Sequence, residues 1–142
     1  MAVLSAITGH IMAAAKTCAD EQALGEEFFA MHLSGGTTEL LYVEPWDTAV
    51  KCRIIGGTTD VSAGQLIDRT GVNMGIEFPC GKFIEQISDK ALITGKIKIK
   101  NTDGYYNFSG FQNKTEQMYS SGTNKTAVAS YCLDVVYSFL KN

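Results

Sequence analysis

Few side chains of this 142-residue chain stand in a pattern that could do chemistry, and the cysteines come first among them. Four are present, with no C-x-x-C pair that could bring two thiolates onto one zinc ion. Cys80 stands between Pro79 and Gly81 in a predicted turn, so it is the only candidate for an exposed thiol, although buried free thiols are the favoured interpretation of the cysteines. A reactive thiol also needs a lowered pKa, which nothing near Cys80 indicates. The other thiols fall within predicted elements and are expected to be buried and reduced: Cys18, Cys52 and Cys132.

Histidines and carboxylates add no catalytic or metal-binding pattern. His10 and His32 adjoin no motif, and the fifteen acidic residues form no EF-hand loop and no paired acid–base motif. We therefore predict no metal and no cofactor, and we predict that the chain is not an enzyme. An enzyme that uses Cys80, or a site assembled from distant parts of the fold, is kept as a third alternative.

A glycine–threonine segment, Ile54-Ile55-Gly56-Gly57-Thr58-Thr59-Asp60, could bind phosphate, because backbone amides and hydroxyls can converge on an anion. The segment resembles the phosphate loops of the actin and sugar-kinase superfamily, and that resemblance implies nucleotide binding. The superfamily fold needs two large domains, whereas 142 residues make one small domain. A turn at Gly56-Gly57 that leads into the next element is therefore the favoured interpretation.

Three lysines alternate with isoleucines near the middle of the chain: Lys96, Lys98 and Lys100. Basic residues beside aromatic residues on a sheet can bind single-stranded nucleic acid. The formal net charge of the chain is −3, however, and alternate lysines also keep the outer face of a strand solvated and its edge unpaired. We expect a solvated strand face and do not expect nucleic acid as a partner.

The charge distribution and one tryptophan indicate an interface. Residues 1–47 hold one basic and seven acidic residues, whereas residues 48–142 hold eleven basic and eight acidic residues, so opposite surfaces of two copies could attract. Trp46 lies in a predicted Pro-Trp-Asp turn, where it could anchor a contact or fold back onto the sheet. The candidate interface residues are Glu26, Glu27, Trp46, Lys96, Lys98 and Lys100.

The elements that would position these residues begin with a helix over residues 3–24, whose apolar residues recur every three or four positions and which Gly25 would end. A three-stranded β-meander follows at 26–33, 37–44 and 48–55, although a helix over 20–33 fits the first of these segments as well. Ser62 and Gln65 form a predicted capping box for a helix that ends at Thr70.

The second half of the chain contains the clearest patterns. Residues 72–88 are ambiguous, since Phe83, Ile84 and Ile87 fit a helical turn and Gly75–Phe78 could be a short strand. Alternation over 90–112 predicts a β-hairpin whose turn is 101–104. An apolar stripe from Val128 to Leu140 predicts a C-terminal helix capped by Thr123 or Asn124. The prediction is one α+β domain over residues 1–142, an antiparallel sheet flanked by amphipathic helices at both ends.

These features favour a non-catalytic structural subunit that self-assembles into a ring, tube or shell, such as a phage head or tail component. Its partners would be other copies of itself and other subunits of the particle. The alternative is a small regulatory binding module for a protein or a small ligand. No apolar run approaches the roughly 18 residues of a membrane helix, and the first residues lack the basic start of a signal peptide. We therefore expect the chain in the cytoplasm or in a virus-like particle assembled there, with no membrane contact.

Overall fold

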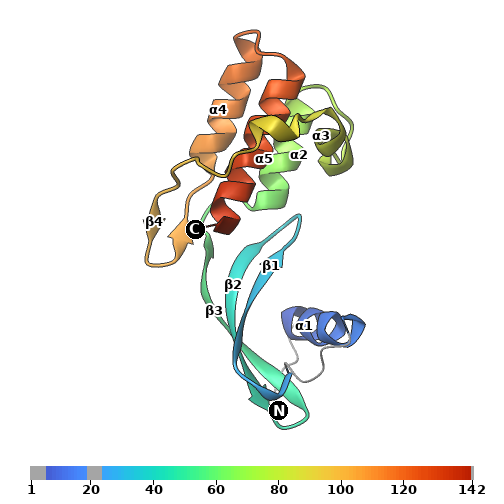
Figure 1. Cartoon of the computed structure of the whole chain (residues 1–142), viewed down its shortest axis with the longest axis vertical. Coiled ribbons are helices and arrows are strands. Elements are labelled where there is room, and N and C mark those ends of the chain that lie inside the picture. The colour runs from blue at the N-terminus through green and yellow to red at the C-terminus, as the bar shows by residue number, and fades with distance from the viewer. Residues whose placement is uncertain (1–5, 19–23, 142) are drawn as a thin grey trace. The chain divides into compact units, whose positions relative to one another are not determined.

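The computed structural model describes residues 6–18 and 24–141 (Figure 1). Its strands hydrogen-bond in the order β1-β2-β3-β5-β4, in a mixed and mostly antiparallel sheet, and helices accompany it, so the α+β prediction is confirmed. The elements are α1 (Ala6–Thr17), β1 (Phe28–Leu33), β2 (Thr38–Trp46), β3 (Ala49–Thr58), α2 (Ala63–Asn73), α3 (Gly81–Ile87), the 3₁₀ helix η2 (Lys90–Leu92), β4 (Asn101–Thr102), β5 (Tyr105–Tyr106), α4 (Ser109–Ser120) and α5 (Lys125–Lys141).

The chain forms two compact units. The first consists of Met1–His32 and Glu39–Gly57, and the second of Leu33–Thr38 and Thr58–Asn142. The prediction of a single domain stays a prediction. Among the described residues, no helix is both long enough and apolar enough to cross a membrane.

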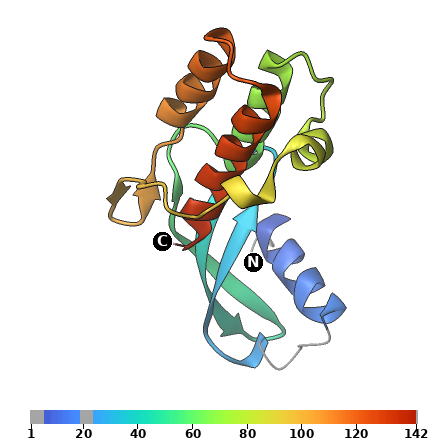
Figure 2. The same ribbon diagram turned by 45° about the horizontal axis from the view of Figure 1, so that its top comes forward.

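The first unit packs α1 on the β-meander, as both ribbon views show (Figures 1 and 2). Ile7, Ile11 and Met12 of the helix contact a buried cluster of Leu41, Val43 and Val50 from β2 and β3. Removing these side chains from water stabilises the unit by about 25 cal/mol per Å² of apolar surface. The packing of one helix face on the apolar face of the meander therefore stabilises the helix.

The boundaries of this unit differ from the sequence prediction in three places. Helix α1 ends at Thr17 rather than at 24, residues 3–5 and 19–23 of the predicted helix lie outside the described residues, and Gly25 lies in a short 3₁₀ turn rather than at a helix end. The first strand is confirmed over β1, so a helix there is wrong. β2 continues through Trp46 to a turn at Asp47, so the predicted Pro-Trp-Asp turn is too early.

The predicted turn at Gly56-Gly57 is also wrong, because both glycines are buried inside β3. They pair with Leu40 and Glu39 of β2, beside an irregularity in the register between Leu40 and Leu41. Gly57 has a φ of 145°, which glycine adopts easily and other residues rarely do. The glycines thus let the strand pass the irregularity instead of ending it.

The second unit is built on helices α2, α4 and α5, which contact one another (Figure 2). Phe108 is fully buried and meets Phe139 edge to face at a ring distance of 5.4 Å, and Tyr106 meets the same ring at 4.9 Å. Aromatic pairs in this geometry contribute about 0.5–1.5 kcal/mol beyond their burial. These rings hold the β5–α4 connection against α5.

Helix α2 begins as predicted, with the capping box of Ser62 and Gln65 fully formed. The helix does not end at Thr70 but continues through Gly71 to Asn73. A Cβ atom at Gly71 would lie 2.6 Å from Sγ of Cys80, so this glycine serves close packing rather than a helix end. In the ambiguous segment, α3 confirms the helical turn around Ile84, and no strand forms at Gly75–Phe78.

Residues 93–100 alternate between half-buried and exposed as expected, but they form no strand. The backbone N–H of Gly95 donates to the Asp134 carboxylate, and that of Ile97 donates to Ser138 Oγ at 3.1 Å. The segment is thus bonded to polar side chains of α5 in place of a neighbouring strand. The hairpin is correspondingly short, and it consists only of β4 and β5.

The predicted return strand through Phe111 is wrong, because α4 begins at Ser109. The Asp60 carboxylate accepts hydrogen bonds from the backbone N–H groups of Phe108 and Ser109 at 2.8 and 2.9 Å and so supplies the missing cap. The C-terminal helix is confirmed as α5, and Asn124 Oδ1 caps it by accepting from Ala127 N at 2.8 Å.

Candidate binding cleft

An open cleft of about 510 Å³ lies within the second unit. Helix α2 lines one side with residues spaced three or four apart, which places them on one face of the helix. Helix α4 contributes two residues one turn apart. The lining residues are Gly35, Gln65, Asp68, Arg69, Val72, Asn73, Phe78, Gln112 and Glu116.

Gly35 reaches the cleft because the turn that carries it is fixed to the first turn of α2. Within the turn, Ser34 Oγ accepts from Thr37 N at 2.9 Å, and the Gly35 carbonyl accepts from the Ser62 hydroxyl at 3.1 Å. Gly64 allows the close approach, since a Cβ atom there would lie 2.5 Å from the Ser34 carbonyl oxygen. Hydrogen bonds and close packing against α2 therefore fix the position of this edge of the cleft.

A chain of hydrogen bonds crosses from α2 to α4. Arg69 Nη1 donates to Gln112 Oε1 at 2.9 Å, and Gln112 Nε2 donates to Glu116 Oε1 at 2.9 Å. Asp68 Oδ1 accepts a hydrogen bond from the backbone N–H of Cys80 at 2.8 Å, and this bond connects the lining residue Asp68 to the start of α3. The cleft thus presents one guanidinium, two carboxylates and three side-chain amides in held positions.

Two exposed apolar side chains complete the lining. Phe78 is 68% exposed and Val72 is 54% exposed, although both are large apolar residues. An exposed aromatic ring beside fixed polar groups suits a ligand with one planar ring and several polar atoms. The arrangement can bind such a ligand, and its guanidinium can hold a carboxylate through two parallel hydrogen bonds.

Cys80, the candidate for an exposed thiol in the sequence, is buried. It is fully buried next to Gly71, and its burial, followed by the charge of Asp68, raises the pKa of its thiol. Burial also raises the pKa of the Cys132 thiol to about 12. Neither thiol is therefore activated as a nucleophile. The burial predicted for Cys18 is wrong, because this cysteine is exposed just after α1, and Cys52 is only half-buried.

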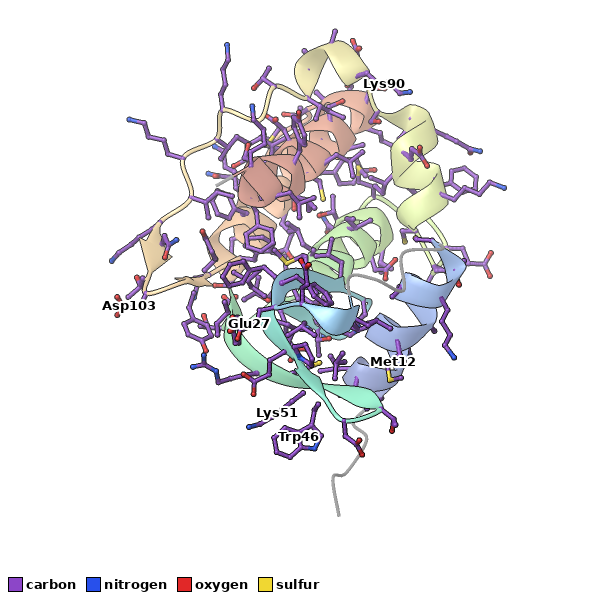
Figure 3. All side chains as sticks on the ribbon, turned by 60° about the horizontal axis from the view of Figure 1, so that its bottom comes forward. Met12, Glu27, Trp46, Lys51, Lys90 and Asp103 are labelled. Carbon is purple, nitrogen blue, oxygen red and sulfur yellow. The ribbon has the colours of Figure 1, made fainter. Side chains whose placement is uncertain are left out.

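The candidate interface residues do not form one surface within a unit. Glu26, Glu27 and Trp46 belong to the first unit, and the three lysines belong to the second. Trp46 is 55% exposed rather than folded back, and Lys51 Nζ lies 5.3 Å from the centre of its ring (Figure 3). The interface role of these residues stays a prediction, with Lys96, Lys98 and Lys100 all exposed.

The remaining sequence candidates have structural roles. His10 and His32 lie with ring centres 5.6 Å apart, and His32 Nδ1 is 3.5 Å from Glu39 Oε2. Within the ranges that the structure describes, no group of three histidine, cysteine or acidic side chains is placed to hold a metal ion.

Burial alone would raise the pKa of the Asp60 carboxyl, but the hydrogen bonds from Phe108, Val61 and Ser109 outweigh it and hold that pKa below its usual range.

Comparisons with known proteins find relatives that are named for tRNA modification. No protein family model matches the chain. It is 32% identical over 123 residues to the tRNA N6-adenosine threonylcarbamoyltransferase of Streptococcus agalactiae serotype Ia, which covers 84% of this chain and 34% of the relative. Proteins of the same name from Streptococcus uberis and Oenococcus oeni are 30% and 34% identical over 122 and 103 residues, covering 84% and 72% of this chain and 34% and 28% of the relatives.

These relatives overturn the functional prediction from sequence. They carry the name of a transferase, so the predicted self-assembling subunit of a virus-like particle is wrong, and so is the prediction that the chain is not an enzyme. A regulatory module does not fit that name either. That prediction relied on the absence of catalytic motifs from the sequence. A site assembled from distant segments leaves no such motif, and the cleft brings Gly35, Arg69 and Gln112 together from three of them. The chain spans about a third of the length of the curated relatives that it matches.

Proposed function

We propose that this chain takes part in the transfer of a threonylcarbamoyl group to N6 of an adenosine in tRNA, the reaction for which its relatives are named. Its own contribution would be to bind the threonylcarbamoyl-adenosine group in the cleft. The single observation that carries this assignment is the cleft itself, where Arg69 and the amides of α2 and α4 stand beside an exposed aromatic ring. The similarity over 84% of the chain supports the choice of reaction.

The threonylcarbamoyl group offers what this lining recognises. It is a threonine whose amine is joined to a carbonyl, so it carries a carboxylate, a hydroxyl, an N–H and a carbonyl oxygen. Arg69 is the cation of the cleft and can pair with the carboxylate, exchanging its bond to Gln112. The amides of Gln65, Asn73 and Gln112 both donate and accept, as the other three groups require.

The adenosine part matches the remaining lining. A purine ring can stack on the exposed face of Phe78, and such stacking contributes about 1–3 kcal/mol per base. The Asp68 carboxylate has about four acceptor positions, of which Cys80 N occupies one, so it can also accept from a ribose hydroxyl. The same cleft thus accommodates the base, the sugar and the attached amino acid.

Calorimetric titration with the free nucleoside N6-threonylcarbamoyladenosine tests this proposal. Arg69→Gln should weaken binding by about 10- to 100-fold, since hydrogen bonds to charged groups contribute about 1.5–3 kcal/mol. Arg53→Gln is the matched control, because Arg53 belongs to the first unit and stacks over Tyr42 at 5.4 Å. Plain adenosine, which lacks the carboxylate, should bind wild type and Arg69→Gln equally weakly.

The proposal would be overturned if the wild-type chain did not bind the nucleoside. Equal losses in Arg69→Gln and Arg53→Gln would overturn it too, because a general effect of charge would then explain the result.

A further inference from the structure

The lysine-bearing segment, residues 95–100, is held against α5. Ile97 and Ile99 pack against the buried cluster of the second unit, and the N–H groups of Gly95 and Ile97 are bonded to α5 side chains. Because side chains alternate along an extended backbone, Lys96, Lys98 and Lys100 all project outward, about 6.6 Å apart. The packing of the isoleucines thus fixes where the three charges stand.

A fourth lysine and an aromatic ring lie next to this segment. Gly95 has a φ of 66° and no side chain, and a Cβ atom there would lie 2.7 Å from Cδ of Lys141 and 2.8 Å from the Tyr137 ring. Lys141 Nζ lies 5.4 Å from the centre of that ring, and Tyr137 is 44% exposed. We call Lys96, Lys98, Lys100, Lys141 and Tyr137 the lysine strip.

The lysines of the strip face solvent and lack acidic partners in the described part of the chain. In residues 6–18 and 24–141, none of its four lysines forms an ion pair with an acidic side chain. The protection of an open strand edge, which alternate lysines suggest in the sequence, does not apply, because residues 93–100 are not a strand of the sheet. The structure therefore presents three evenly spaced lysines and a fourth lysine near Gly95, none of them paired with a carboxylate that the structure describes, on a chain whose net charge is −3.

We propose that the lysine strip binds the phosphate backbone of RNA, in a single-stranded part of the tRNA. This inference rests on the proposed function, which makes tRNA the partner. Evenly spaced cations on a fixed line suit a polyanion with a regular charge spacing. Tyr137, 44% exposed beside Lys141, adds an aromatic ring against which one unpaired base can stack, and this favours RNA over an acidic protein surface.

Binding of an unmodified tRNA transcript, followed by fluorescence anisotropy across a range of salt concentrations, tests the strip. Each lysine–phosphate contact contributes about −0.7 to the slope of log affinity against log salt for single strands. The variant Lys96→Gln/Lys98→Gln/Lys100→Gln should therefore lower the magnitude of that slope by about 2 and weaken binding about 100-fold at 0.1 M salt. The matched control, Lys82→Gln/Lys114→Gln/Lys125→Gln, removes three exposed charges elsewhere in the same unit and should change binding only slightly.

Equal losses in the two triple variants would overturn the inference, as would a wild-type chain that binds polyglutamate as tightly as tRNA. The nucleoside titration separates this inference from the proposed function. A chain that binds the nucleoside but not tRNA would refute the strip alone. A chain that binds tRNA through the strip but not the nucleoside would refute the cleft assignment and leave the strip standing.

Discussion

Replacing Gly64 by alanine should loosen the edge of the cleft without touching any polar group in it. The new Cβ atom would lie 2.5 Å from the Ser34 carbonyl oxygen and 2.7 Å from Cα of Gly35, both of which are backbone atoms. Contacts of a Cβ atom below 3.0 Å essentially do not occur, so the turn must move away from α2. Overpacking of this kind costs about 1–3 kcal/mol.

The structure offers a matched control in Gly110. Both glycines are the second residue of their helix, in α2 and α4, but apart from its chain neighbours and the backbone of its own helix, no atom lies within 4 Å of a Cβ atom at Gly110. Alanine in place of glycine in a helix stabilises a protein by about 0.5–1 kcal/mol where the space is open. Gly110→Ala should therefore be slightly more stable than wild type, and Gly64→Ala less stable by about 1–2 kcal/mol.

Thermal unfolding measures this difference. For a chain of this size, 1 kcal/mol corresponds to about 2–4 °C in Tm, so the two variants should differ by about 3–12 °C. Gly64→Ala should also bind N6-threonylcarbamoyladenosine several-fold more weakly, because Gly35 moves with the turn. If both variants gained stability in parallel, the turn would not be seated on α2 and the account of this edge of the cleft would be refuted.

Three further predictions concern the second unit and α1. Asp60→Ala should lose about 1 kcal/mol of stability with the cap of α4. Because the folded pKa of this carboxyl is lowered, wild type should keep its advantage above about pH 4 and lose it as the pH falls further, which unfolding at pH 7 and pH 3 can check. Iodoacetamide at pH 7.5 should label Cys18 well before Cys80, as mass spectrometry of the peptides would show, and equal labelling would contradict the burial of Cys80. Asp134→Ala should speed hydrogen exchange at the Gly95 amide more than tenfold, and an unchanged rate would contradict its bond to α5.

The sequence predicted correctly those elements that depend on interactions between residues close together in the chain. The capping box at Ser62 and the C-terminal helix capped by Asn124 depend on neighbouring residues, and both formed as expected. The β-meander followed from alternation in the same way. Helix α4 was missed because Asp60, which caps it, lies 48 residues before Phe108, so the signal that starts this helix is not in its own sequence.

The segment 93–100 shows how a correct pattern can predict the wrong structure. Alternation placed Ile97 and Ile99 toward the core and the lysines toward solvent, which is what the structure has. The hydrogen-bond partners could not be read from that pattern, since Ser138 and Asp134 of α5 take the place of a neighbouring strand. The cleft was missed for a related reason, because its lining residues meet only through the tertiary fold.

NMR mapping of backbone amides can show whether the cleft binds the threonylcarbamoyl-adenosine group. Titration with N6-threonylcarbamoyladenosine should give its largest chemical-shift changes at Gly35, Arg69 and Gln112, which approach the ligand from three segments of the second unit. Saturable changes centred on the first unit, around Trp46 for example, or no changes at millimolar nucleoside, would contradict binding in the cleft.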